Sequence, residues 1–232
     1  EQGGMMKITG ETFSFNKGID RRLKEAYAGY RPITDEFVAN VDASSLFAVF
    51  MNVDGAGYIS LLHEDKAAQV LLAGMNMAVD MDNIIRSVDG DMALVVTGYD
   101  GDRMQMQLGA RLKTRGFLDD VDYWKQSAPK GSAITDNGKD AYRYSGGDFS
   151  FCFGVSADNR FYAGSTEALA RGILQKSPSP FSPEICKALK GQRMCMLVNV
   201  AKMAEDNEMM GTVMPLLVPV MGKVGTILYI IR

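Results

Sequence analysis

RMQMQLGARL, residues 103–112, alternates apolar and polar side chains without interruption. Such period-two alternation predicts a β-strand with one face packed and one face in water. An apolar run at residues 92–97 precedes it, and YDGD at residues 99–102 is typical of a tight turn between two strands. The stretch therefore predicts an antiparallel hairpin with Met104, Met106 and Leu108 in the core and a solvated opposite face.

Outward from this hairpin, the pattern predicts a mixture of short strands and helices. Ser182, Pro183 and Gly191 form the most complete helix signature, with an N-cap, a first-turn proline and a glycine just past the end. The other helices are expected at 16–30, 42–50, 64–77, 82–88, 117–126, 166–175 and 201–210, and the other strands at 36–41, 141–144, 149–155, 160–163, 194–200 and 226–231. This order predicts an α+β fold, with a mostly antiparallel sheet or sheets built from hairpins and meanders and the interspersed helices packed on one face.

The sequence allows two interpretations of the domain organisation. Residues 1–232 form either a single α+β domain or two intimately packed subdomains. The two-subdomain interpretation depends on a weak internal sequence similarity. Val38-Ala39-Asn40-Val41 and Leu197-Val198-Asn199-Val200 resemble each other, and each precedes an expected helix. Around residues 36–50 and 194–210 this similarity suggests a diverged duplication.

Composition narrows the class of protein. Hydrophobic residues make up 47% of the chain and charged residues 23%, which is typical of a folded domain. The net charge is -3 with no run of Lys and Arg, so we predict no nucleic-acid partner. No stretch of about 18 apolar residues occurs, so we predict no transmembrane segment.

The sulfur-containing residues favour core packing. Cys152 and Cys195 lie in apolar strand patterns, so we expect both to be buried and reduced, with a disulfide as the alternative. The chain also has 16 methionines, with several between Met203 and Met221. They are interpreted as core residues, and an adaptable apolar surface for a partner or lipid is the competing interpretation.

Common catalytic motifs are not present. His63 is the single histidine, and the fourth position after it is Ala67, which excludes an HExxH zinc site and weakens any Ser–His–Asp triad. Gly138-Lys139 and Gly222-Lys223 lack the rest of a phosphate-binding loop. Gly55-Ala56-Gly57 lacks the third glycine of a dinucleotide fingerprint and does not follow a clear predicted strand.

The acidic residues cluster in short groups that turn and helix-cap roles explain. We therefore predict no catalytic, cofactor-binding or metal-binding residues, and no cofactor. Paired carboxylates that meet only in space stay open as an alternative, because such pairs leave no sequence motif. The groups are Asp80/Asp82, Asp89/Asp91, Asp100/Asp102 and Asp119/Asp120/Asp122.

Three stretches carry a family resemblance: MMKITG at residues 5–10, FSFNKG at 13–18, and the strand–turn–strand–helix run at 151–175. With these the chain resembles a domain-of-unknown-function family of secreted or surface lipoproteins from gut Bacteroidetes. The resemblance covers most of the chain. It implies the C-terminal part of a longer protein, a cell-envelope or extracellular location, and no known activity.

The sequence thus favours a non-enzymatic binding or structural module of the bacterial cell envelope, whose partner is a protein or another envelope ligand. The alternative is a hydrolase-type enzyme with scattered carboxylates. Two carboxylates with raised pKa in one pocket would favour the enzyme. A broad apolar or aromatic patch would favour the binding module.

Overall fold

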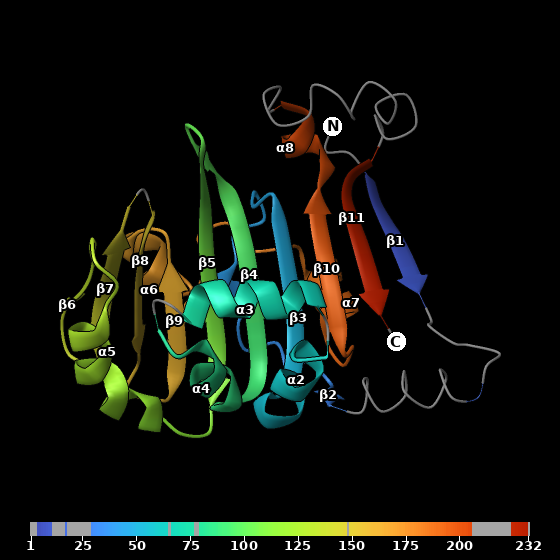
Figure 1. The fold of residues 1–232 in the computed structure, drawn as a ribbon. Coiled ribbons are helices and arrows are strands. Elements are labelled where there is room, and N and C mark those ends of the chain that lie inside the picture. Colours follow the sequence, from blue (N-terminus) through green and yellow to red (C-terminus); the bar gives the residue numbers. More distant parts are fainter. Residues whose placement is uncertain are drawn as a thin grey trace.

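One large β-sheet organises the molecule (Figure 1). The computed structural model describes residues 4–10, 17, 29–64, 66–76, 79–147, 149–205 and 224–231. Within them, eleven strands follow the order β1-β11-β10-β3-β4-β5-β9-β8-β7-β6, with β2 paired to β3. β1 and β11 are parallel, and the other pairings between described strands are antiparallel. The predicted α+β, mostly antiparallel fold is confirmed.

The bounds of the elements follow the chain order. The strands are β1 Gly4–Gly10, β2 Tyr30–Arg31, β3 Phe47–Asp54, β4 Val88–Asp100, β5 Arg103–Leu112, β6 Ser132–Asp136, β7 Ala141–Gly146, β8 Phe149–Val155, β9 Arg160–Gly164, β10 Met194–Asn199 and β11 Val224–Ile231. The helices are η1 Val38–Asn40, α2 Gly55–Leu62, α3 Lys66–Asn76, α4 Met81–Arg86, η2 Gly116–Asp120, α5 Val121–Ser127, α6 Glu167–Gly172, α7 Pro183–Leu189 and α8 Val200–Glu205.

The central hairpin is β4–β5, as predicted, and Gly101 adopts the positive φ that its tight turn needs. The prediction of a solvated face was wrong. Gln107 is 5% exposed, and a Cβ on Gly109 would lie 2.8 Å from both Ile173 and Phe37. Distant parts of the chain therefore cover the face that the strand pattern assigns to water. Met104 is also misassigned, because it is 45% exposed at the hairpin's free end.

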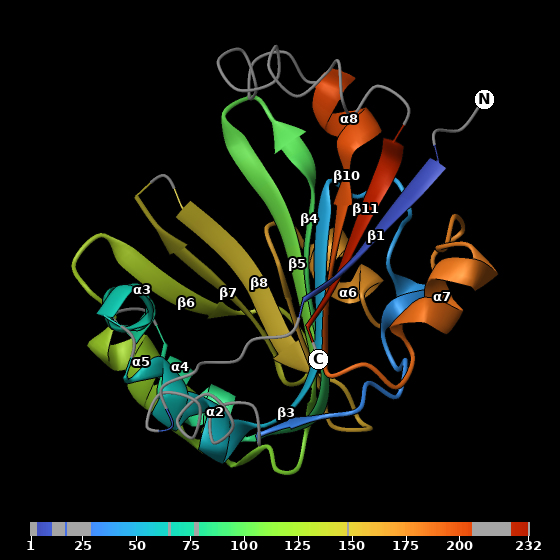
Figure 2. The same ribbon diagram turned by 90° about the vertical axis from the view of Figure 1, so that its right-hand side faces the viewer.

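Helices lie on both faces of the sheet, where the pattern predicted one (Figure 2). We call the face that carries α2–α5 the front and the opposite face the back. Trp124 and Phe117 pack on the front with Val49, Phe153 and their neighbours. On the back, side chains from η1, α6 and α7 pack against strand residues that include Phe50 and Leu197.

Several local predictions are confirmed. The strands at 141–146, 149–155 and 160–164 lie where the pattern places them. Ser182 caps α7 by accepting a hydrogen bond from the N–H of Ile185, with Pro183 in the first turn. Cys152 and Cys195 are buried free thiols in strands.

Other local predictions were wrong. Residues 47–50, expected as the end of a helix at 42–50, instead begin β3, because an apolar run does not distinguish a buried strand from a helix. Residues 38–40, expected as strand, form η1. The two stretches of the suggested internal similarity thus differ in secondary structure, and the duplication itself stays a prediction. Strands β1 and β6 were missed.

The C-terminal strand lies inside the sheet. β11 pairs with β10 on one side and β1 on the other, and Leu228 and Ile230 are fully buried. Most of the methionine-rich stretch between Met203 and Met221 lies outside the described residues, as does most of the helix expected at 16–30. No described helix has the length and apolarity to cross a membrane.

Candidate functional site

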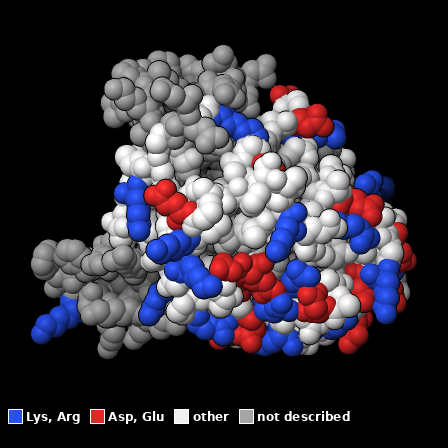
Figure 3. All heavy atoms as spheres, turned by 180° about the vertical axis from the view of Figure 1, so that it is seen from behind, with Lys and Arg blue, Asp and Glu red and all other residues white. Residues whose placement is uncertain are grey.

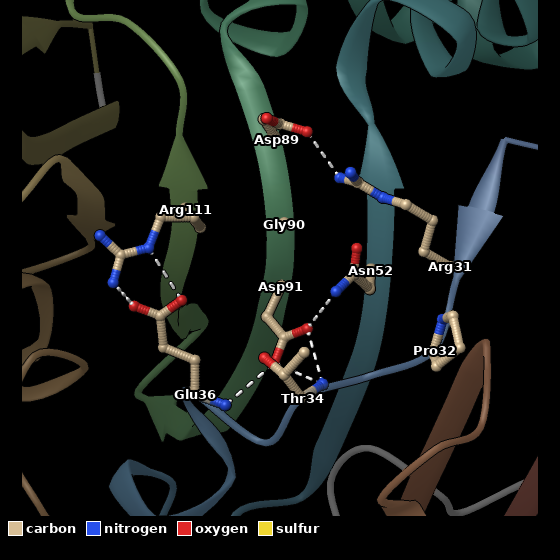
Figure 4. A pocket seen from close by; sticks show the side chains of 9 residues that line it. All are labelled: Arg31, Pro32, Thr34, Glu36, Asn52, Asp89, Gly90, Asp91 and Arg111. Carbon is tan, nitrogen blue, oxygen red and sulfur yellow. Dashed lines mark hydrogen bonds and ion pairs between the residues drawn. The ribbon is translucent and has the colours of Figure 1, made fainter.

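A polar pocket of about 470 Å³ opens where β2, β3, β4 and β5 meet the loop that follows β2 (Figure 4). Two guanidinium groups and three carboxylates line it, so its walls carry one more negative than positive charge. The lining residues are Arg31, Pro32, Thr34, Glu36, Asn52, Asp89, Gly90, Asp91 and Arg111.

Asp91 anchors the pocket. Its carboxylate is 3% exposed and accepts hydrogen bonds from the Thr34 N–H at 3.0 and 3.1 Å, the Thr34 hydroxyl at 2.9 Å and the Glu36 N–H at 2.9 Å. The Asn52 amide donates a further bond at 2.7 Å. A buried carboxylate needs such donors to offset its desolvation. Asp91 therefore fixes the loop 32–36 against the sheet.

Two ion pairs form the pocket's walls. Arg31 lies 2.8 Å from Asp89, and both side chains are more than 40% exposed. Arg111 and Glu36 form a bidentate ion pair. Arg111 Nε donates to Glu36 Oε2 at 3.0 Å, and a second guanidinium nitrogen donates to Oε1. All three carboxylates of the pocket thus have cationic or neutral donors as partners.

Gly90 provides the room for this arrangement. It has a φ of +148°, and a Cβ there would lie 2.7 Å from the Arg111 side chain. A glycine within a strand commonly marks a close approach of another group. Here the missing side chain leaves room for the stem of Arg111, whose guanidinium group binds Glu36.

One polar atom in the pocket has no partner within the described residues. Asn52 is 5% exposed, and its Oδ1 is buried without a hydrogen bond. Leaving such an acceptor unsatisfied costs about 1–3 kcal/mol. It is the feature of the pocket that internal bonding does not explain.

The second candidate is the front face of the sheet. At one level, paired side chains run across nine strands, and none of them is charged. This row is Ile8, Tyr229, Met196, Val49, Leu94, Leu108, Ala163, Phe153 and Tyr142.

A second row lies two residues along each strand and is also uncharged. It consists of Met6, Ile227, Val198, Phe47, Val96 and Met106. The first charged side chain at the level of the longer row is Asp136 on β6, opposite Tyr142. We call the two rows, together with Tyr99, Met104 and Phe149, the apolar front face.

Part of the apolar front face is exposed. α2–α5 cross its lower part in Figure 1, and the described helices leave its upper part uncovered. Six large apolar side chains on this face are exposed: Met6, Ile8, Leu94, Tyr99, Met104 and Phe149, with values from 37% to 57%. Burial raises the pKa of Tyr142, so its phenol stays neutral. Seen from behind, the molecule instead carries many interspersed Lys, Arg, Asp and Glu side chains over its lower part (Figure 3).

The acidic groups singled out in the sequence have different structural roles. Asp80 caps α4, and Asp100 and Asp102 flank the hairpin turn, as predicted. Asp119 and Asp122 lie in first helical turns, also as predicted.

The turn-and-cap interpretation was wrong for Asp89 and Asp91, which line the polar pocket. Thr34, the main partner of Asp91, lies 57 residues away, so no local motif marks this site.

The single histidine and the glycine stretch 55–57 lie at the two ends of α2. His63 follows the end of α2, is exposed, and lies 2.8 Å from Asp82. Gly55 directly follows β3 and starts α2, where a Cβ would collide with the Ile85 carbonyl oxygen. No group of three or more His, Cys, Asp or Glu in the described part of the chain is placed to hold a metal ion.

Comparisons with known proteins give a family and a distant fold likeness. The family model described as domain of unknown function DUF4836 matches residues 1–200. No curated protein matches the chain. Crystal forms III and I of TP0453 are similar in structure at 10% and 9% sequence identity, with TM-scores of 0.45 and 0.43. The match covers 70% and 72% of this chain but 62% and 63% of those chains, which is less than two thirds of their length.

Proposed function

Since the chain belongs to the DUF4836 family, whose function is unknown, its role must be argued from its own surface, and we propose that it is a non-catalytic binding module of the bacterial cell envelope. Its ligand is an acyl chain or a similarly uncharged aliphatic group. The binding surface is the apolar front face. The envelope location rests on the family resemblance of the sequence.

The single observation that carries this proposal is the uncharged character of the two paired rows, together with the exposure of Met6, Ile8 and Leu94 within them. Scattered exposed apolar residues are normal, but a contiguous apolar patch marks an interaction surface. Leu94 and Ile8 belong to the same row and are 37% and 39% exposed. Transferring about ten methylene groups from water to such a surface yields roughly 8 kcal/mol, before the loss of free motion is subtracted.

The chemistry of the face favours an aliphatic ligand over a protein partner. Its strands are paired on both sides across most of the sheet, which leaves few backbone groups for a ligand. Protein–protein interfaces carry about one hydrogen bond per 100–200 Å² and a polar rim. Methionine side chains such as Met196 and Met106 adapt to flexible apolar partners.

The polar pocket gives less support to the hydrolase alternative. A general acid or base needs a carboxyl group that is free to exchange a proton with substrate. Asp91 is engaged by the backbone of 34–36 and by Asn52, and Asp89 and Glu36 are engaged by arginines.

Titration with cis-parinaric acid, a fluorescent polyunsaturated fatty acid, tests the proposal. Leu94→Asn and Ile8→Asn should each weaken binding by about tenfold, since a polar group then replaces apolar contact. Val70→Asn on α3 is the matched control, because Val70 is 76% exposed and lies outside the apolar front face. Thermal unfolding of each variant establishes that it is folded.

Three results would contradict the proposal: no saturable binding by the wild-type protein, equal effects of Val70→Asn and Leu94→Asn, or a dimer that Leu94→Asn dissociates. The last result, seen by sedimentation, would assign the face to a second copy of the chain. Fractionation of cells that carry the natural gene tests the envelope location, and recovery only in the cytosol would reject it.

A further inference from the structure

The polar pocket has a hydrogen-bond acceptor whose orientation is fixed by its neighbour. The Asp91 carboxylate can only accept hydrogen bonds, so the Asn52 atom 2.7 Å from it must be the NH₂ group. The amide oxygen therefore points away from Asp91, as Figure 4 shows. It is buried and has no partner within the described residues. An unsatisfied acceptor in a polar pocket indicates a missing hydrogen-bond donor.

We propose that this pocket is a second binding site, separate from the apolar front face, for a small neutral polyol such as a monosaccharide. A ligand hydroxyl donates to Asn52 Oδ1. Other hydroxyls bond to the rims formed by the Arg31–Asp89 and Arg111–Glu36 pairs, which offer donors and acceptors side by side. The near balance of charge favours a neutral ligand over an anion or a cation. The volume of about 470 Å³ is sufficient for one sugar ring.

Binding requires a small opening of the pocket wall, because less than 1 Å² of Asn52 Oδ1 is accessible. The Arg31–Asp89 pair is the more exposed wall, at 44% and 42%, and exposed ion pairs contribute little to stability. Arg31 belongs to a strand of two residues. Arg31 also donates a hydrogen bond to the Val53 carbonyl oxygen at 2.8 Å, whereas Arg111 is held by Glu36 at two points and donates to the Asp158 carbonyl oxygen as well.

Nuclear magnetic resonance titration with the unmodified protein tests the site directly. Glucose, galactose and myo-inositol are the probes, with ethanolammonium and inorganic phosphate as the charged comparisons. The side-chain amide resonances of Asn52 should shift saturably with at least one neutral probe and not with the charged ones. No shift with any neutral probe, or saturable shifts with a charged probe alone, overturns the proposal.

Two variants separate binding from folding. Asn52→Leu should weaken sugar binding about five- to tenfold, the loss expected for one hydrogen bond. Asn199→Leu is the matched control, because that asparagine lies on β10 and bonds to Ala43 and Lys202 outside the pocket. Equal affinity of Asn52→Leu and wild type overturns the proposal. If Asn52→Leu does not fold, the titration of the wild-type protein decides alone.

Discussion

At the scale of single residues, Cys195 shows how the sheet changes the chemistry of a side chain. It is fully buried on the back of β10. Burial raises the pKa of its thiol to about 12, although the charge of Lys7 acts in the opposite direction. A thiol with so high a pKa is neutral and slow to react at neutral pH.

This thiol links stability to alkaline pH. The unfolded chain releases the proton near pH 9.0, whereas the folded chain retains it until about pH 12, so the folded state binds more protons in this window. Stability should therefore fall as the pH rises through it, by up to about 1.4 kcal/mol per pH unit from this group.

Urea unfolding of wild type and Cys195→Ala at pH 8, 9 and 10 measures the effect. The difference in free energy of unfolding between the two proteins should shrink as the pH rises. A difference that is constant across this range would show that the thiol titrates alike in both states.

At the scale of elements, β5 combines a covered and an open end on the same face. Leu112 at its lower end is 3% exposed and packs in the front core, whereas Met104 at its upper end is 45% exposed. Leu112→Ala should cost about 2–4 kcal/mol, because it leaves a cavity. Met104→Ala should cost about 1 kcal/mol or less, as at a surface site.

Urea unfolding of both variants provides the measurement. Similar losses at the two positions would mean that the upper end of the face is as tightly covered as the lower end. The apolar front face would then have no room for an acyl chain.

β5 also shows what its sequence reveals and what it hides. Alternation correctly predicts the strand, its hairpin and which side chains share a face. It does not reveal what covers the other face, because Phe37 and Ile173 lie far from Gly109 in the sequence. The glycine itself was the available signal, since a strand glycine often marks close packing.

The candidate sites were hidden for the same reason. The sequence around Asp91 predicts only a turn or helix-cap role. Its role in the pocket becomes visible when the fold brings Thr34 and Asn52 within hydrogen-bond distance. The apolar front face becomes visible only when the strand registers are known, because each strand alone shows two or three ordinary apolar positions. The front-facing residues of β3 cannot be identified from its sequence, because its apolar run does not alternate with polar residues.

At the scale of the whole molecule, β11 joins the two ends of the chain. Among the described strands, β11 is the partner that holds β1, and it also lies against β10. Its segment TILYII is apolar and β-branched, the type of strand that aggregates when it or its neighbours are left unpaired. In the structure this strand is paired on both sides.

Removal of residues 225–232 should therefore produce a protein that aggregates. β10 would become an edge strand, and Cys195 and Leu197 would lose the neighbouring Leu228 and Ile230 of the back core. Size-exclusion chromatography with light scattering measures the outcome, and removal of Arg232 alone is the matched control. A truncated protein that stayed monomeric and folded would mean that β10 tolerates an open edge. In that case β11 would be a separable strand, of the kind that adds to the sheet of another chain.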